Sequence, residues 1–359
     1  MKNFKIALPI FCSLVFAILF NSCKPDFEIT SEYRDITVVY GLLNPEDNQH
    51  YIKIYKGYLT ADNALVWAQD LDNISYYDDI EVKLIESNNI NGEVKTYPMD
   101  TVMSVYKNYG VFPSPTQVLY RPVKNLTSHK PAEIKENCTY QLVITNKKTG
   151  EVVTAQTSTI ANMAFNIPTG TSQSVSSINL NYDDPWPVGF KPSSWPENAY
   201  AVDAYLTFKY IEKNIQTGDT VHKAISDICM TSGFVQGNET AFKPSSVYRV
   251  IHDNLEPNDN VLRYPDTYAC IDIKLWTCDE VYYTYYKTAQ PSSSIVQDRI
   301  KYTNIVSENE NALGFFASRT YYQRKFTINV TDSHIEDSLV HGQWTKNLNF
   351  RPYTDFLER

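Results

Sequence analysis

Two pairs of adjacent carboxylates, Asp78-Asp79 and Asp183-Asp184, are the nearest approach to a catalytic group in this sequence. Hydrolysis of a glycosidic bond uses two carboxyl groups that flank the bond. Neighbouring residues on a strand point to opposite faces, so neither pair can flank a sugar in this way. The chain also lacks the nucleophile-elbow, zinc-protease, dinucleotide-binding and phosphate-loop motifs. We therefore expect no enzymatic activity, and a glycan-active hydrolase assembled from distant acids is the remaining alternative.

Metal and cofactor chemistry is not indicated by the spacing of possible ligands. The acidic loop at 70–73 lacks the spacing and the glycine of an EF-hand. The histidines also show no ligand spacing, and they are His50, His129, His222, His252, His334 and His341. We expect neither a metal nor a cofactor.

The thiol of Cys23 is the group whose surroundings most clearly predict a chemical modification. A positively charged start precedes an apolar run at 6–20, which is the pattern of a secretory signal. At 1.5 Å per residue such a helix spans about 22 Å, short of the roughly 30 Å hydrocarbon core of a bilayer. The residues LFNSC before and at Cys23 resemble the bacterial lipobox, in which the thiol is acylated. We therefore expect a lipoprotein signal peptide at 1–22 and a lipid such as palmitate on Cys23, with a chance cysteine after an ordinary signal as the alternative.

Residues 23–34 are predicted to be a polar tether between the lipid and the folded part. Pro25 prevents a helix from continuing here, and two or more acyl chains would hold the chain firmly at a membrane. Asp26 and Glu28 resemble the surface-export signal of Bacteroidetes-type lipoproteins. The predicted location is the cell envelope, lipid-anchored in the outer membrane and exposed at the surface.

Composition favours an acidic, aromatic-rich β protein. Of 32 basic and 41 acidic residues, the signal holds two lysines and no acids, which leaves the mature chain with 30 basic residues and a net charge of −11. Nucleic acid is therefore not an expected partner. The 27 tyrosines and 16 phenylalanines favour pleated, half-buried surfaces.

Alternation of apolar and polar residues predicts strands along most of the mature chain, most clearly at 200–210. The predicted fold class is mainly β, with two β-sandwich-like (Ig-like) domains. The N-terminal β-sandwich domain is expected at 35–166 and a C-terminal β-rich domain at 199–359. A stretch rich in Pro, Ser, Gly and Asn at 167–198 indicates a linker or long connection between them.

One short helix is predicted in the C-terminal domain, near residues 279–288. Thr277 can cap it, while Asp279 and Glu280 lie in its first turn near the positive end of the helix dipole.

Four cysteines lie beyond the signal and the lipid position, and they are Cys138, Cys229, Cys270 and Cys278. If 269–276 is a strand, about 26 Å separates Cys270 from Cys278, whereas a disulfide needs Cα atoms within about 7 Å. Cys229 is therefore the expected disulfide partner of Cys270 or Cys278. The alternative is that all four are small, buried apolar residues.

Trp186 and Trp195 stand between prolines in the stretch DPWPVGFKPSSWPENAY. Prolines hold the backbone extended, so these rings lose little entropy when they bind a sugar or a partner protein. The alternative is that the two rings pack beneath the connection as a lid on the core.

Three blocks of sequence resemble a known family. They are GEVVTAQTSTI after TYQLVITN, ACIDIKLWTCDEVYYTYYKTA, and YTNIVSENENALGFFASR. Together with the cysteine at the start of the mature chain, they are similar to the Bacteroidetes lipoproteins classed as domain of unknown function 4249. The resemblance implies an envelope lipoprotein of the kind often associated with TonB-dependent outer-membrane receptors, without established catalytic residues.

The predicted function is therefore that of a non-catalytic outer-membrane or cell-surface lipoprotein, a binding or accessory component of a TonB-dependent receptor system. Its expected partners are the membrane, through the N-terminal lipid, an outer-membrane receptor protein, and a glycan. The alternative function is that of an adhesin or a matrix or glycan-binding protein.

Overall fold

A computed structural model describes most of the chain beyond residue 35. The described residues are 36–57, 64–110, 113–161, 163, 165–166, 176–177, 180–183, 188–192, 195–235, 240–266, 269–289, 302–327 and 334–358. Cys23 and Trp186 lie outside these ranges.

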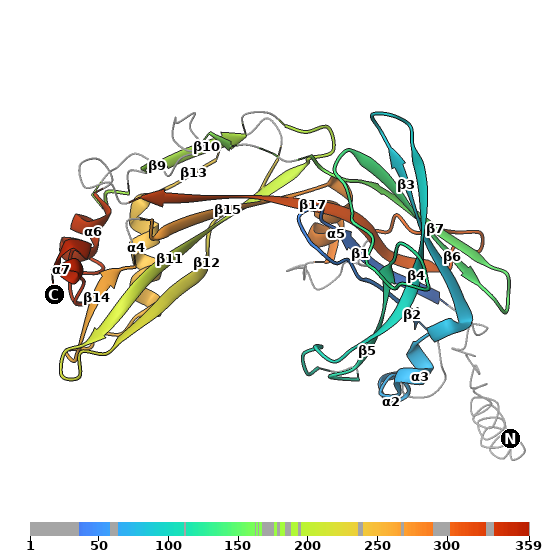
Figure 1. Ribbon diagram of the computed structural model, residues 1–359, viewed down its shortest axis with the longest axis horizontal. Helices are drawn as coiled ribbons and strands as arrows, with labels where there is room; N and C mark the ends of the chain where they lie inside the picture. The colour runs from blue at the N-terminus through green and yellow to red at the C-terminus, as the bar shows by residue number, and fades with distance from the viewer. Residues whose placement is uncertain are drawn as a thin grey trace, which may run out of the picture.

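The mainly β prediction is confirmed, because most of the described strands join one large mixed sheet (Figure 1). Its strand order is β12-β11-β15-β17-β1-β2-β5-β4-β3-β6-β7-β16, with β14 beside β11 and β9 beside β17. The strands of the first half are β1 Ile36–Leu43, β2 Ile52–Gly57, β3 Ile80–Asn88, β4 Val94–Ser104, β5 Gln117–Pro122, β6 Cys138–Asn146 and β7 Val152–Ser158. Those of the second half are β9 Ser176–Ser177, β11 Ala201–Asn214, β12 Thr220–Val235, β14 Val261–Pro265, β15 Ile271–Cys278, β16 Val306–Ser307 and β17 Ala312–Thr327. A small separate sheet contains β8 Phe165–Asn166, β10 Val188–Pro192 and β13 Thr240–Phe242.

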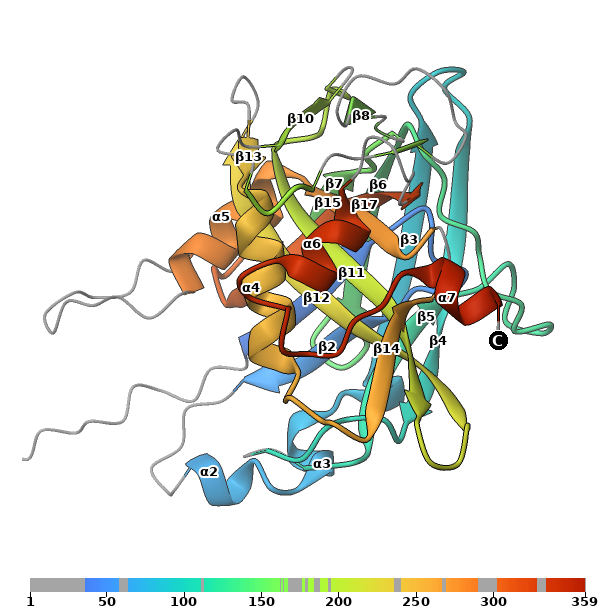
Figure 2. The same ribbon diagram turned by 90° about the vertical axis from the view of Figure 1, so that its left-hand side faces the viewer.

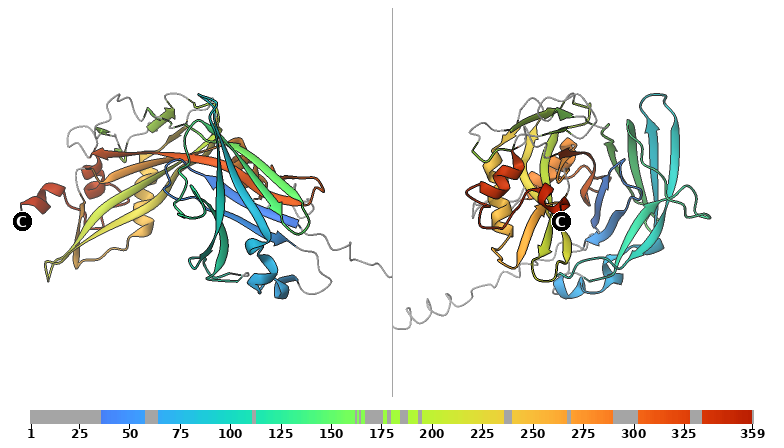
Figure 3. Two further views of the ribbon diagram at one scale, coloured as in Figure 1. Left: turned by 45° about the vertical axis from the view of Figure 1, so that its right-hand side comes forward. Right: turned by 60° about the vertical axis from the view of Figure 1, so that its left-hand side comes forward.

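The long strand β17 joins the two lobes of the molecule. Its first half runs parallel to β1, from Thr37 opposite Ala312 to Leu43 opposite Ser318. Its second half runs antiparallel to β15, with Cys278 opposite Arg319. Figure 1 shows β17 passing from the lobe that contains β1–β7 to the lobe that contains β11, β12 and β15, and the left view of Figure 3 shows the same connection from another direction.

Each lobe has its own hydrophobic core, and β17 contributes to both. In the first lobe, Phe316 packs with side chains of β1–β7. In the second lobe, Phe326 packs with the apolar face of β11 and β15. The predicted split into two sandwich-like domains is not confirmed, because a single sheet continues through both lobes. The boundaries at 35–166, 167–198 and 199–359 stay predictions.

Helices help to close the core of the second lobe. The helix α4 (Pro244–Asn254) and the helix α6 (Ile335–His341) bury Val247, Ile251 and Leu339 in the same cluster as the strand residues. Figure 2 looks onto this end of the molecule, where α4, α6 and α7 (Tyr353–Leu357) lie in front of the strands.

The predicted helix near 279–288 is confirmed as α5 (Glu280–Ala289). The expectation of a single helix in this part of the chain is wrong, because α4, α6 and α7 are present as well. In α4, Val247, Tyr248 and Ile251 share one buried face and Pro244 stands at the first turn, where a missing N–H costs nothing. The first lobe also has α2 (Ala64–Trp67), α3 (Leu71–Ile74) and the 3-10 turn Tyr77–Asp79.

Candidate functional site

A cleft of about 440 Å³ lies where the side chains of β11, β12, β15 and β17 meet α5. It continues into a smaller hollow of about 150 Å³ beside Gly233 and Lys287. The side chains that line both hollows are Asp203, Tyr205, Cys278 and Tyr282. The larger one is also lined by Asp227, Trp276, Thr277 and Arg319.

Strand alternation places these side chains on the face opposite the core. In β11, Val202, Ala204 and Leu206 are buried in the second core, so Asp203 and Tyr205 point the other way. In β15, Ile273 and Leu275 take the core side, which leaves Lys274 and Trp276 on the side of the cleft. The core therefore fixes the positions of the cleft residues.

One wall of the cleft is formed by Arg319 and Trp276, and two cations contact the Trp276 ring. The guanidinium carbon of Arg319 lies 4.4 Å from the centroid of the Trp276 ring. The Nζ atom of Lys274 lies 4.2 Å from the same centroid and 3.8 Å from that of Tyr321. Burial and the nearby charge of Arg319 lower the pKa of Lys274. Contacts of this kind hold a cation in place without neutralising it.

The other wall carries acidic groups and a phenol. Oδ1 of Asp203 accepts a hydrogen bond of 2.6 Å from the backbone N–H of Gly233, which holds the carboxylate in place. Asp227 is exposed and has a left-handed backbone, with φ of 57°. Burial raises the pKa of Tyr205, and the negative charges of Asp203 and Asp227 add to this effect. The cleft is therefore of mixed charge, with cations and acids on different strands.

The position of α5 depends on Asp279, which precedes its first residue. Its carboxylate accepts hydrogen bonds of 2.8 Å from Tyr282 N, from Ser318 N and from the Thr157 hydroxyl. Asp279 thus joins β7 of the first lobe to β17 and α5, and burial raises its pKa to about 6. It also takes the capping role predicted for Thr277, which is a buried residue of β15 instead.

Aromatic contacts hold α5 against the strands at the junction of the two lobes. The Tyr285 ring lies 4.6 Å from that of Phe315, and the Tyr285 hydroxyl donates a hydrogen bond of 3.1 Å to the Tyr40 hydroxyl. Tyr282 contacts Phe315 as well, with ring centroids 5.7 Å apart. These contacts fix the helix that supplies the Tyr282 wall of the cleft.

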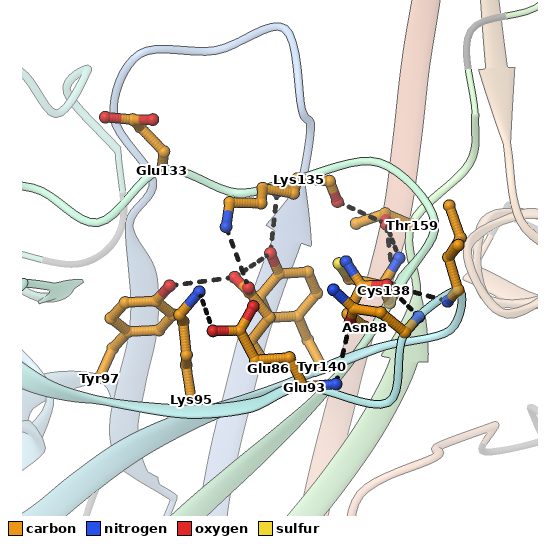
Figure 4. A network of polar contacts seen from close by, with 12 residues as sticks. Glu86, Asn88, Glu93, Lys95, Tyr97, Glu133, Lys135, Cys138, Tyr140 and Thr159 are labelled. Atoms are coloured by element: carbon orange, nitrogen blue, oxygen red, sulfur yellow. Dashed lines mark hydrogen bonds and ion pairs between the residues drawn. The ribbon is translucent and has the colours of Figure 1, made fainter.

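A second polar cluster, in the first lobe, centres on Glu86 (Figure 4). This carboxylate is 2% exposed. One of its oxygens accepts hydrogen bonds from the hydroxyls of Tyr140 (2.8 Å) and Tyr97 (3.1 Å). The other oxygen lies 3.4 Å from Nζ of Lys135. Because each oxygen already has a donor, we assign this cluster a structural role in joining β3, β4 and β6.

The predicted aromatic contact residues are not placed together in a described site. Trp186 lies outside the described residues. Trp195 is partly buried against the second core, with its ring 6.1 Å from that of Phe234 at an angle of 83°. For Trp195, packing on the core, which was the alternative interpretation, is the arrangement found.

The predicted disulfide is not formed, because all four described cysteines are free. Cys229 lies opposite Tyr205, which in turn lies opposite Lys274. Cys270 and Cys278 are four residues from Lys274 in either direction, so about 13 Å along the strand and two strand spacings across separate them from Cys229. A disulfide needs Cα atoms within about 7 Å.

The cleft residues were not identified from the sequence, although part of the signal was present. Alternation in the strand at 200–210 already put Asp203 and Tyr205 on one face. Arg319 lies more than forty residues beyond Trp276 in the sequence, and the pattern of either segment alone does not show that the two strands are neighbours.

Comparison with protein families shows the family to which this chain belongs. A family model described as domain of unknown function (DUF4249) matches residues 24–325, which is most of the chain. The chain belongs to this family. DUF4249 includes the cleft residues up to Arg319, the whole of β15 and nearly all of β17. A search of curated proteins found no match.

Two further observations concern only the described part of this DUF4249 chain. No helix there has both the length and the apolar character needed to cross a membrane. No group of three or more His, Cys, Asp or Glu side chains there is arranged to hold a metal ion.

Proposed function

We propose that this DUF4249 protein is a non-catalytic lipoprotein of the outer membrane or cell surface. In this proposal it is a binding or accessory component of a TonB-dependent receptor system. The observation that carries the proposal is the cleft of about 440 Å³ on the side of the sheet opposite the second core. Its volume is in the range of small-ligand sites, which combine aromatic walls with a few fixed polar groups.

The residue types in the cleft support binding. Tyr, Trp and Arg are the side chains that most often dominate binding energy at interfaces. Tyr205, Trp276 and Arg319 are all carried by strands of the central sheet. A site on rigid strands loses little freedom when a ligand binds.

The anchor is the second part of the proposal. Lipid on Cys23 would hold the folded lobes near a receptor in the same membrane, which raises their effective concentration. Labelling of cells with an alkyne palmitate should tag the wild type and leave Cys23→Ala untagged. An untagged wild type would remove the anchor from the proposal.

The function itself is tested by purification of the tagged lipoprotein from membranes solubilised in mild detergent. We expect an outer-membrane barrel protein to co-purify. Tyr106→Ala serves as a control that should still co-purify with the barrel protein. Tyr106 is 90% exposed in the loop between β4 and β5 and does not line the cleft. Absence of any barrel protein from the wild-type preparation would contradict the receptor role.

A second candidate function, that of an adhesin or glycan-binding protein, is favoured by the acids and phenol rings in the cleft. It predicts that the purified protein binds cells or polysaccharide without a receptor. A receptor gene beside the gene for this chain would favour the accessory role instead.

A further inference from the structure

We propose that the cleft binds an acidic saccharide, and that Arg319 holds its carboxylate. This inference rests on the proposed binding function and names the chemical class of the ligand.

The first step of the argument is that Arg319, like Lys274 beyond Trp276, has no acidic partner among the described residues. Within the described part of the chain, neither Arg319 nor Lys274 lies within 4 Å of a carboxylate oxygen, whereas Lys209, two strands from Arg319, is paired with Asp272. Nε of Arg319 is buried and has no hydrogen-bond partner among the described residues. Buried donors in folded proteins are normally satisfied, so this N–H indicates a missing acceptor.

The second step is that Trp276 lies between the two cations and fixes the position of Arg319. Trp276 contacts both of them, at 4.4 Å from Arg319 and 4.2 Å from Lys274, and Tyr321 supports Lys274 on a second ring. The register between β15 and β17 puts Lys274 on the other side of Trp276, so Arg319 is the one of the two cations that lines the cleft. The planar guanidinium of Arg319 suits a carboxylate, which can accept two parallel N–H bonds.

The third step concerns the rest of the ligand. Asp203 and Asp227 offer acceptors, so the ligand must also supply neutral donors such as hydroxyl groups. The same two acids disfavour a densely charged polyanion such as nucleic acid. Tyr205 and Tyr282 provide flat apolar surfaces. A sugar acid combines these features, because each sugar unit has one carboxylate, several hydroxyls and an apolar ring face.

The test is isothermal titration of the mature lipidated protein in detergent micelles with a trisaccharide of galacturonate. Galactotriose replaces the carboxylates by neutral groups, and triglutamate keeps them on a peptide. We expect the galacturonate trisaccharide to bind at least about tenfold more tightly than either comparison ligand, since charge-assisted hydrogen bonds are worth about a tenfold change or more.

Variants test the two residues directly. Arg319→Gln should weaken binding of the galacturonate trisaccharide by about tenfold or more, whereas Lys274→Met, which lies beyond Trp276, should weaken it less. The matched control is Lys325→Met, an exposed lysine on the same strand β17 about 20 Å from Arg319, which should change nothing. Circular dichroism and the melting temperature show whether each variant is folded.

Three results would overturn the inference: equal affinity for galactotriose, preferential binding of triglutamate, or no binding of the galacturonate trisaccharide. Co-purification of a receptor shows whether only the ligand class is wrong or whether the proposed accessory function fails as well. If a barrel protein still co-purifies while the trisaccharide does not bind, the ligand class is wrong and the accessory role stands.

Discussion

The two lobes each place charged side chains against aromatic rings, but they leave the charges in different states. In the first lobe, both oxygens of Glu86 are occupied by Tyr97, Tyr140 and Lys135 inside the fold. In the second lobe, Arg319 and Lys274 rest on Trp276 without an acidic partner among the described residues. A charge that already has partners contributes to stability, whereas a charge held in place without one is available to a ligand. The comparison predicts different consequences for mutation of the two clusters.

The largest expected effect is on stability, in the first lobe. Glu86→Ala would leave the hydroxyls of the buried Tyr140 and the partly buried Tyr97 without their acceptor, and we expect a loss of about 4 kcal/mol in the free energy of unfolding. Chemical denaturation measures this loss. Glu81→Ala on the same strand is the control, because Glu81 is exposed and pairs with an exposed lysine. A change below about 1 kcal/mol for Glu86→Ala would contradict the structural role.

The second effect concerns Asp279, where the lobes meet. Burial raises its folded pKa to about 6, above the usual value of 3.8, so the folded protein holds an extra proton between these values. The stability that Asp279 contributes is therefore complete at low pH and is lost as the pH rises through about 6. The measurement is the difference between the free energy of unfolding of the wild type and that of Asp279→Asn. This difference should fall by up to about 3 kcal/mol from pH 4 to pH 7. A difference that does not vary with pH would show that Asp279 is not buried in this way.

The third effect is an expected lack of change. Arg319→Gln and Lys274→Met remove cations that have no acidic partner in the described structure and lose only contacts with aromatic rings, so we expect the free energy of unfolding to stay within about 1 kcal/mol of the wild type. Removal of Lys274 also relieves its repulsion with Arg319. A loss comparable to that of Glu86→Ala would make the two clusters equivalent and would end the distinction between them.

The smallest effect concerns the free cysteines. Cys229 is exposed, whereas Cys138 and Cys270 are buried, and burial raises the pKa of Cys278 to about 12. Of these four thiols, Cys229 should react first with a thiol reagent in the native protein. Cys229→Ser should leave the melting temperature unchanged. A fall of several degrees would instead indicate that Cys229 forms a disulfide.

The sequence contained enough information for the class of fold and for one helix. The alternation of residues 201–210 and the acidic start of α5 predicted those elements, because both signals are local. The length of β17 was not predicted, since its first half pairs with β1 and its second half with β15, each far away in sequence. The helix α4 was missed because its buried face consists of few residues in a short segment.

The cleft could be predicted only in part for the same reason. Asp203 and Tyr205 follow from the alternation of a single strand, and Lys274 and Trp276 follow from that of another. Their combination with Arg319 depends on the register between β15 and β17, which brings Cys278 opposite Arg319. Register is set by the whole packed sheet, and a local pattern does not contain it.

The most direct test measures binding and stability together in two variants. Glu86→Gln and Arg319→Gln are compared by titration with the galacturonate trisaccharide, at a temperature where both are folded, and by their melting temperatures. The account predicts that Glu86→Gln lowers the melting temperature and keeps the wild-type affinity, while Arg319→Gln keeps the melting temperature and loses affinity by about tenfold or more. Equal loss of affinity in both variants, or unchanged affinity in Arg319→Gln, would contradict it.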